Sequence, residues 1–204
     1  MKKRSVKIAV LVSGGGTNLQ ALIDACNSGI IKSGKIELVI SSNPNAYALE
    51  RAARAGIPTV VVSKKDCASQ EDFEAKIKKN LSENDIELIV LAGFMNILSA
   101  DFTNDYPERI INVHPSLIPS FCGKGFYGLR VHEAALQYGV KVTGATVHFV
   151  NEIPDGGRII LQKSVAIKKN DTPEALQRRV MEQAEWKILP RAVELVSKNI
   201  LKQI

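Results

Sequence analysis

Cysteine pairs, long apolar runs and clustered basic residues are all missing from this sequence. The three cysteines, Cys26, Cys67 and Cys122, lie far apart, and no CxxC pair or Cys/His ligand spacing accompanies them. The sequence therefore indicates neither a disulfide framework nor a structural zinc site. The apolar run that begins at Ile8 soon meets glycine, far short of the ~20 residues of a membrane span. We expect a soluble, cytoplasmic protein with no membrane partner.

Basic residues are numerous but scattered. The formal net charge is +6, from 27 Lys and Arg against 21 Asp and Glu. The basic residues occur in short groups, such as Lys2 to Arg4, Lys76 to Lys79 and Lys168 to Lys169, without interleaved aromatics. This balance suits a protein that handles small anions, and we expect no nucleic-acid partner.

The spacing of apolar residues predicts an α/β fold. With 204 residues, 45% of them hydrophobic, the chain has room for one substantial core, and residues 1–204 are predicted to be a single domain. The predicted strands are 7–12, 36–40, 58–62, 87–91 and 110–113, and helices are predicted from Thr17 or Asn18 and over 46–55, 71–81 and 129–138. Such alternation is typical of a three-layer, mostly parallel twisted sheet with helices on both faces.

The last third of the chain has a different pattern. Residues 141–150 and 158–167 flank the turn Pro154-Asp155-Gly156-Gly157, which predicts an antiparallel hairpin near the C-terminal end of the sheet. Thr172 followed by Pro173 is typical of a helix start, because threonine caps the first turn and proline fits its first position. One long final helix is predicted from there.

The glycine loop, residues 13–18 (SGGGTN), joins the first strand to the first helix. Backbone N–H groups and the positive end of a helix dipole make such a junction suited to phosphate. A dinucleotide site is not indicated, because Leu19 stands where a third glycine would be and no acid ends the second strand. A P-loop lysine is also missing. A single phosphate fits best, with a ligand-free tight turn as the alternative.

Asn112 and His114 are two residues apart at the end of a predicted strand. In an extended segment both side chains point to one side, and Pro115 keeps His114 out of a helix. An amide donor beside an imidazole suits oxyanion stabilisation and proton transfer. The alternative is a pair that only completes hydrogen bonds at a strand end.

The remaining polar candidates are less specific. Asp155 lies in a Pro-Asp-Gly turn, where aspartate commonly serves the turn itself. His148 alternates with its neighbours on a strand and is expected to be half-buried or site-lining, whereas His132 is expected at the surface. A metal site of His114, His148 and Asp155 has no supporting HxH, HxxxH or HExxH spacing, and no metal is expected.

A family resemblance rests on motifs that run from about residue 7 to about residue 195. They are SGGGTNLQ at 13–20, AGFM at 92–95, NVHPSL at 112–117, and HFV at 148–150 through DGG at 155–157. In this order they resemble those of the phosphoribosylglycinamide formyltransferases of purine biosynthesis. The Asn-x-His and Asp-Gly set is shared with the wider folate-dependent formyltransferases, and the glycine loop with His-Pro-Ser-Leu narrows the resemblance.

The resemblance implies a Rossmann-like fold and a formyl transfer. The formyl group of the cosubstrate 10-formyltetrahydrofolate would move to the amine of glycinamide ribonucleotide, giving formylglycinamide ribonucleotide and tetrahydrofolate. The partners would be these small molecules, with no metal, and the protein would be a monomer or homodimer. A formyltetrahydrofolate hydrolase is the closest alternative, a methionyl-tRNA formyltransferase would need a further basic domain, and a non-catalytic nucleotide-binding module is a third possibility.

The resemblance also implies roles for individual residues. His114 would be the general acid, Asn112 would bind the formyl oxygen, and Asp155 would hold His114 and raise its pKa. The substrate phosphate would lie on Gly16, Thr17 and Asn18, with Glu185 near the ribose. The pterin would be enclosed by Met95, Asn96, Ile97, Leu98, Asn112, Ile110 and the residues from Val150 to Asp155.

Some positions depart from the family pattern. Asn96 and Gln70 stand where relatives often carry a basic residue, which places a contact of Gln70 with the folate tail in question. The loop from Cys122 to Gly128 is longer than in many relatives. The stretch before Trp186 is one residue longer, which makes Glu182 a rival to Glu185.

Overall fold

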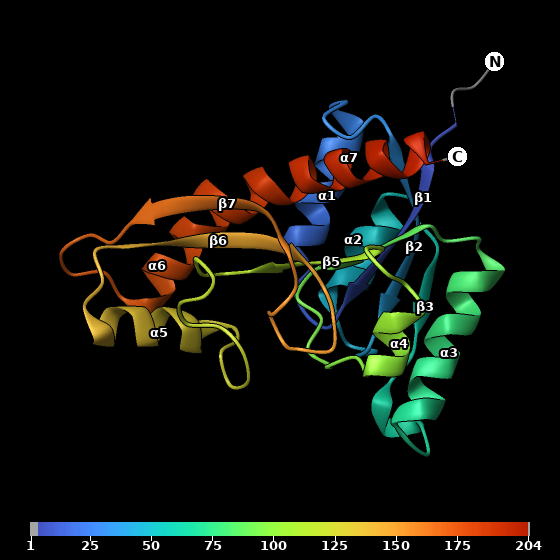
Figure 1. Cartoon of the computed structure of the whole chain (residues 1–204), viewed down its shortest axis with the longest axis horizontal. Helices are drawn as coiled ribbons and strands as arrows, with labels where there is room; N and C mark the ends of the chain where they lie inside the picture. The colour runs from blue at the N-terminus through green and yellow to red at the C-terminus, as the bar shows by residue number, and fades with distance from the viewer. Residues whose placement is uncertain (1–3, 204) are drawn as a thin grey trace.

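Residues 4–203 are described by the structure, a computed structural model, and they form one seven-stranded sheet with helices on both faces (Figure 1). Lys2 and Lys3 lie outside this range. The strands are β1 (Val6–Val12), β2 (Gly34–Ser41), β3 (Thr59–Val61), β4 (Leu88–Leu91), β5 (Ile110–His114), β6 (Val142–Phe149) and β7 (Ile159–Ala166). The helices are α1 (Thr17–Asn27), α2 (Tyr47–Arg54), α3 (Gln70–Glu83), α4 (Ala100–Asn104), α5 (Leu129–Tyr138), α6 (Pro173–Val180) and α7 (Trp186–Lys202).

The strand order is β3-β2-β1-β4-β5-β6-β7. The strands from β3 to β5 pair in parallel, and β6 and β7 add an antiparallel hairpin. The predicted fold class is therefore confirmed. Because the chain winds outward in both directions from β1 and β4, the crevice beyond their carboxyl ends is where an open sheet of this kind binds ligands.

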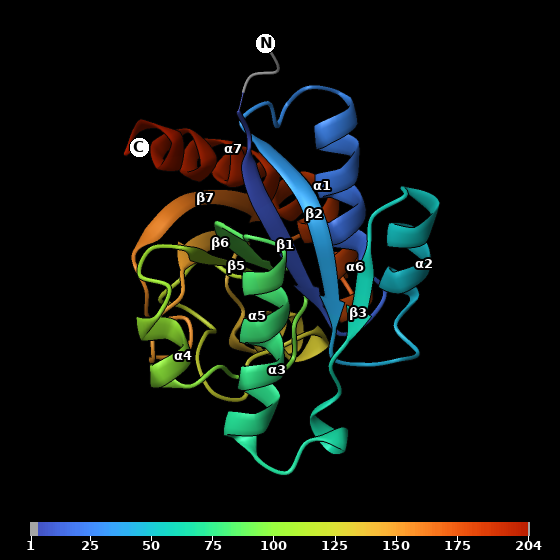
Figure 2. The same cartoon turned by 90° about the vertical axis from the view of Figure 1, so that its right-hand side faces the viewer.

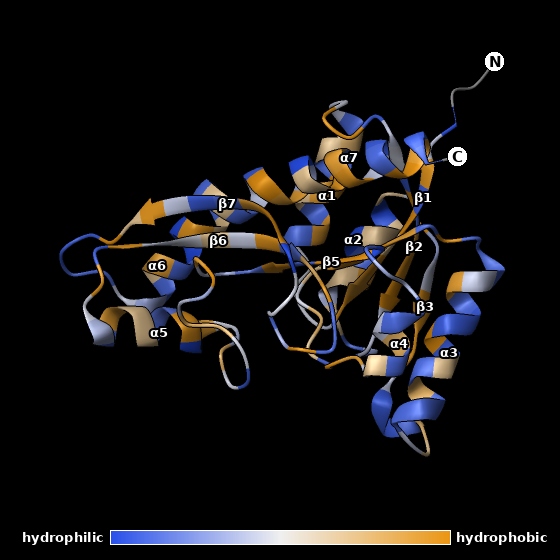
Figure 3. Ribbon diagram, in the orientation of Figure 1, coloured by the Kyte–Doolittle hydropathy of each residue, from blue (hydrophilic) through white to orange (hydrophobic). Residues whose placement is uncertain are grey.

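Each face of the sheet carries its own hydrophobic core. Alternate residues of β1 point to opposite faces, so Ile8 and Val10 join one core and Ala9 and Leu11 the other, all fully buried. Helices α1 and α7 cover the first core, and α3 and α4 cover the second (Figure 2). Burial on both faces explains the near-continuous apolar runs of the central strands, which Figure 3 shows in the hydrophobic colour.

The ends of several helices were predictable from local chemistry. The Thr172 hydroxyl accepts a hydrogen bond from the Ala175 N–H, with Pro173 at the first helical position. Gly139 ends α5 in the left-handed conformation, with φ of 82°. No helix within residues 4–203 has the length and apolar character needed to cross a membrane.

Two helical features differ from the prediction. The short helix α4 was not predicted. The expected long final helix is interrupted by a π-helical turn, Met181–Glu185, between α6 and α7. A π-turn holds one more residue than an α-turn, so it accommodates an extra residue without changing the helical face presented afterwards.

Candidate active site

A cavity of about 640 Å³ lies beside the ends of β4 and β5. Its walls come from four segments, 91–98, 112–115, 123–128 and 148–155. The residues predicted to enclose the pterin, Met95, Asn96, Ile97, Leu98 and Asn112, line it together with His114 and Asp155. Ile110 does not line the cavity, because it is fully buried in the core beneath α3 and α4. The loop of residues 123–128 forms a wall that the motifs did not predict.

The pairing of β5 with β6 brings Asn112 and His148 together. The two residues are direct partners in the antiparallel ladder. Their side chains meet with 3.2 Å between Asn112 Nδ2 and His148 Nε2, while His148 Nδ1 lies 2.8 Å from the Phe149 carbonyl oxygen. Because a carbonyl only accepts, Nδ1 of His148 carries the proton and Nε2 accepts from the Asn112 amide. His148 thereby orients the Asn112 side chain, a role that spacing alone could not reveal.

Asp155 lies between the two histidines. One carboxylate oxygen is 3.5 Å from His114 Nδ1, and the other is 3.5 Å from His148 Nε2. The Gly123 N–H donates to the same oxygen that faces His114, at 2.8 Å. Asp155 also has a φ of 57°, a left-handed conformation that Asp and Asn tolerate better than most residues. Asp155 therefore shapes its turn and faces His114 at the same time.

Burial, more than Asp155, sets the protonation of His114. Only 4% of this residue is exposed, and burial lowers the pKa of His114 below its ordinary value although the Asp155 charge opposes the change. The prediction of a raised pKa for His114 is therefore wrong: Asp155 does act to raise this pKa, but the net change is a lowering. Burial also disfavours the Asp155 carboxylate, but contact with His148, the His114 charge and the Gly123 N–H together hold the pKa of Asp155 below its usual range.

Both ring nitrogens of His114 have a partner in this arrangement. Nδ1 faces Asp155, and Nε2 lies 2.9 Å from the Phe121 carbonyl oxygen. A carbonyl partner places the proton of the neutral ring on Nε2. Phe121 precedes the cavity wall 123–128, so this wall and His114 are connected through one hydrogen bond.

His132 was predicted at the surface, and that prediction is wrong. The residue is fully buried in α5, and neither ring nitrogen has a hydrogen-bond partner within the described chain. Burial, assisted by the nearby His114, lowers the pKa of His132 to about 4. The early position in a helix did not indicate that α5 turns this face inward.

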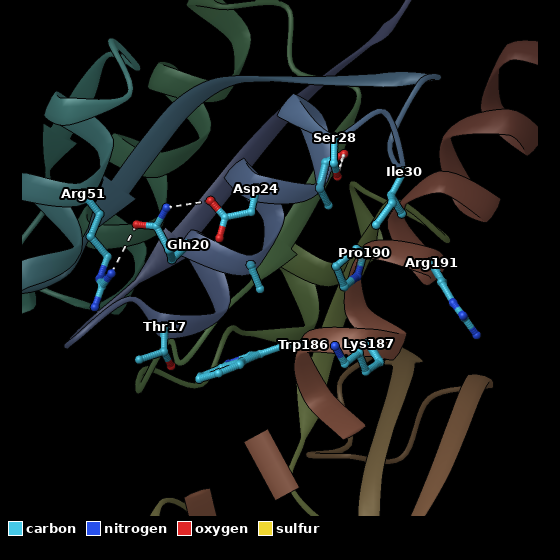
Figure 4. Close-up of a pocket in the computed structure, with 12 residues that line it drawn as sticks. Thr17, Gln20, Asp24, Ser28, Ile30, Arg51, Trp186, Lys187, Pro190 and Arg191 are labelled. Atoms are coloured by element: carbon cyan, nitrogen blue, oxygen red, sulfur yellow. Dashed lines mark hydrogen bonds between the residues drawn. The ribbon is translucent and has the colours of Figure 1, made fainter. Parts of the chain in front are cut away.

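The glycine loop packs closely against α2. The Ala48 N–H donates to the Gly14 carbonyl, and Arg51 Nε donates to the Gly15 carbonyl. A groove of about 470 Å³ runs along α1 from Thr17, and Figure 4 shows Gln20 joining Arg51 to Asp24 on its wall. These bonds hold the loop at the start of α1, where the first N–H groups have no partner within the helix and are available to an anion.

Gly16 is required by its surroundings. Its φ is 69°, and a Cβ atom built there would lie 2.7 Å from the Ala48 Cβ. Gly16→Ala should therefore lower the free energy of unfolding by about 1–3 kcal/mol, from left-handed strain and the contact with α2. Denaturant unfolding measures this, with Gly15→Ala as the control because a Cβ there meets nothing within 4 Å. Equal stability of the two variants would contradict the expectation.

Glu185, rather than its rival Glu182, faces the glycine loop. Glu185 is buried and accepts a hydrogen bond of 2.7 Å from Asn18, whereas Glu182 lies at the surface in an ion pair with Arg178. The π-turn ends at Glu185 and turns it inward. Burial raises the pKa of Glu185 to about 7, an effect that the Asn18 hydrogen bond opposes.

The raised pKa of Glu185 predicts a stability change with pH. From its ordinary pKa of 4.5 up to about 7, the folded protein keeps a proton that the unfolded chain has released. The free energy of unfolding therefore falls as pH rises through this window, by about 3 kcal/mol from this group. Glu185→Gln, neutral throughout, should be more stable than the wild type at pH 8 and similar to it at pH 4.

Denaturant unfolding at both pH values tests this expectation, with Glu182→Gln as the exposed control. His132 contributes the opposite slope, since its pKa is lowered, but it does so equally in every variant. If the difference between Glu185→Gln and the wild type does not change with pH, the buried carboxyl is not the cause.

Comparison with known proteins gives consistent matches. The family model described as formyl transferase matches residues 6–193. The chain is 44% identical to the trifunctional purine biosynthetic protein adenosine-3 of Homo sapiens over 98% of this chain, but it spans only 19% of that relative's length. It is 42% identical to the phosphoribosylglycinamide formyltransferase of Haemophilus influenzae, covering 96% of this chain and 89% of that protein.

A solved structure agrees with the sequence matches. The structure of glycinamide ribonucleotide transformylase 1 from Symbiobacterium toebii has a TM-score of 0.89 to this chain at 40% identity. The likeness covers 96% of this chain and 89% of that one. The residues matched by the family model include the glycine loop and all four segments of the cavity wall.

Proposed function

The chain belongs to the formyl transferase family, and we propose that it transfers the formyl group of 10-formyltetrahydrofolate to the amine of glycinamide ribonucleotide. The products are formylglycinamide ribonucleotide and tetrahydrofolate, as in de novo purine biosynthesis. The names of the relatives support this choice over a hydrolase.

The observation that carries the proposal is the meeting of three polar side chains in one largely apolar cavity. Asn112, His114 and Asp155 line it together with the wall of Met95 to Leu98. The Met95 N–H donates to Ser13 Oγ, so this wall touches the start of the glycine loop. A flat pterin ring and a phosphorylated acceptor would thus have adjoining sites.

The chain's side chains match the needs of a formyl transfer. The acceptor amine attacks the formyl carbon, a C–N bond forms, and the formyl oxygen gains negative charge. Asn112 and His114 donate hydrogen bonds to that oxygen. The bond from carbon to the folate N10 then breaks, the attacking nitrogen loses a proton and N10 gains one. Nδ1 of His114 faces Asp155, so Nε2 is the nitrogen open to the substrate: in the protonated ring it gives its proton to N10 and then receives the proton that the attacking nitrogen loses.

The resting hydrogen bond to Phe121 has to open during this cycle. Nε2 of His114 donates to the Phe121 carbonyl, and Nδ1 faces Asp155. A donor to the formyl oxygen is therefore available only after Nε2 leaves Phe121. Asp155 then holds the ring and stabilises its protonated form.

The acceptor lies at the other side of the site. The N–H groups of Gly16, Thr17 and Asn18 bind its phosphate, assisted by the dipole of α1. Glu185, fixed by Asn18, accepts or donates a hydrogen bond at the ribose. We further propose that the domain acts in the cytoplasm, as one unit over residues 1–204, either as a monomer or as a homodimer.

The test is a transfer assay with purified protein, 10-formyltetrahydrofolate and glycinamide ribonucleotide. Tetrahydrofolate and formylglycinamide ribonucleotide should appear in equal amounts, and neither should appear when the ribonucleotide is omitted. Formate release without the ribonucleotide would identify a hydrolase instead. No turnover of formyltetrahydrofolate under either condition would remove both activities.

A further inference from the structure

The cavity wall from Met95 to Leu98 has no regular structure of its own. These residues lie between β4 and α4, outside any helix or strand. The Met95 and Ile97 side chains are not covered by the protein, at 56% and 63% exposed, whereas Leu98 at the end of the wall is buried in the core. An irregular segment that holds apolar groups toward solvent needs support from outside itself.

That support comes from a buried carboxylate on α3. Only 4% of Glu74 is exposed, and Glu74 accepts hydrogen bonds from both the N–H and the hydroxyl of Ser99. Glu74 forms no ion pair within the described residues. A buried carboxylate is costly unless its oxygens are satisfied, so the position of Ser99 is tightly determined by Glu74.

Gln70 extends the same support to the middle of the wall. Its Nε2 lies 2.5 Å from Glu74 Oε1 and 3.2 Å from the Ile97 carbonyl oxygen. The side chain is thus directed to the backbone of the wall. The far end is held independently, by the hydrogen bond from the Met95 N–H to Ser13.

We propose that Glu74 and Gln70 are a positioning pair that holds the wall from Met95 to Leu98 in the conformation that binds the folate ring. The proposal rests on the proposed function, because it names formylfolate as the ligand of the wall. Neither residue touches the reacting atoms. Their contribution is to order the wall before the ligand arrives, so that binding does not have to order it.

Loss of the pair should weaken folate binding selectively. Gln70→Ala and Glu74→Ala should raise the KM for formyltetrahydrofolate by roughly tenfold, with the KM for the ribonucleotide and kcat at saturation little changed. Glu74→Gln should lie between wild type and Glu74→Ala, because the amide still accepts from the Ser99 N–H. Glu71→Gln is the matched control, since Glu71 is exposed on the same helix.

A second measurement does not depend on catalysis. Hydrogen exchange of the Ser99 amide in the protein without substrates should be at least tenfold faster in Glu74→Ala and unchanged in Glu71→Gln. The Gln70→Ala variant, which removes a half-buried amide only, covers the case in which Glu74→Ala does not fold.

The two measurements separate failure of this inference from failure of the proposed function. An inactive wild type would end the formyl transfer, and unchanged Ser99 exchange in Glu74→Ala would end the positioning role. Unchanged KM for formyltetrahydrofolate in folded Gln70→Ala and Glu74→Gln would also overturn it, as would an equal rise in KM for both substrates.

Discussion

Asp155→Asn should leave the protein folded and lower kcat by about a hundredfold or more. Asparagine adopts the left-handed conformation of residue 155 at least as readily as aspartate, and its amide oxygen still accepts from the Gly123 N–H. The negative charge facing His114 is lost. A protonated His114 then has no counter-ion in a buried site, and transfer through it becomes unfavourable.

The pKa of His114 gives an independent reading of the same variant. Burial lowers this pKa and the Asp155 charge partly restores it, so removing the charge should lower the pKa further. An NMR titration of the imidazole measures the change. Glu152→Gln is the matched control, because Glu152 is a second carboxylate of the cavity with no contact to His114. A folded Asp155→Asn protein with normal kcat and unchanged His114 titration would confine Asp155 to its turn.

Asn112→Ala and His114→Ala should each reduce kcat by about 10²- to 10³-fold. Both side chains leave the same strand on the same side and line the same cavity, so both are placed to act on one developing oxyanion. Groups that act as a unit are strongly non-additive. The double variant should therefore lose far less than the product of the two single losses.

Steady-state kinetics at saturating concentrations of both substrates measures these effects. Ile111→Val is a suitable control, because Ile111 directly precedes Asn112 on the same strand but is fully buried in the core on the opposite face of the sheet. Wild-type turnover in His114→Ala would end the proposed mechanism, and fully multiplicative losses would separate the roles of the two residues.

The parts of the site that could be predicted are those governed by local spacing. Asn112 and His114 share a side because side chains alternate along a strand. The glycine loop was predicted because it joins the end of an apolar strand to the start of a helical pattern. The hairpin around Asp155 was indicated by its turn residues. These inferences require only neighbours in the chain.

The parts that could not be predicted depend on tertiary packing. The burial of His132 and the lowered pKa of His114 both arise from segments far away in the sequence. Glu185 and Glu182 differ by three residues, nearly one helical turn, and only the π-turn decides which of them faces inward. Gln70 was considered for the folate tail, but its amide is directed to the backbone of Ile97.

Ser13 connects the glycine loop to the cavity wall that begins at Met95. Its hydroxyl accepts from the Met95 N–H at 2.9 Å and lies 2.6 Å from the Ser42 hydroxyl, while its own backbone leads directly into the glycine loop. We expect a ligand that tightens this loop also to tighten the anchor of the cavity wall at Met95. Coupling between two binding sites is reciprocal. If the acceptor raises the affinity for folate through Ser13, folate raises the affinity for the acceptor by the same factor.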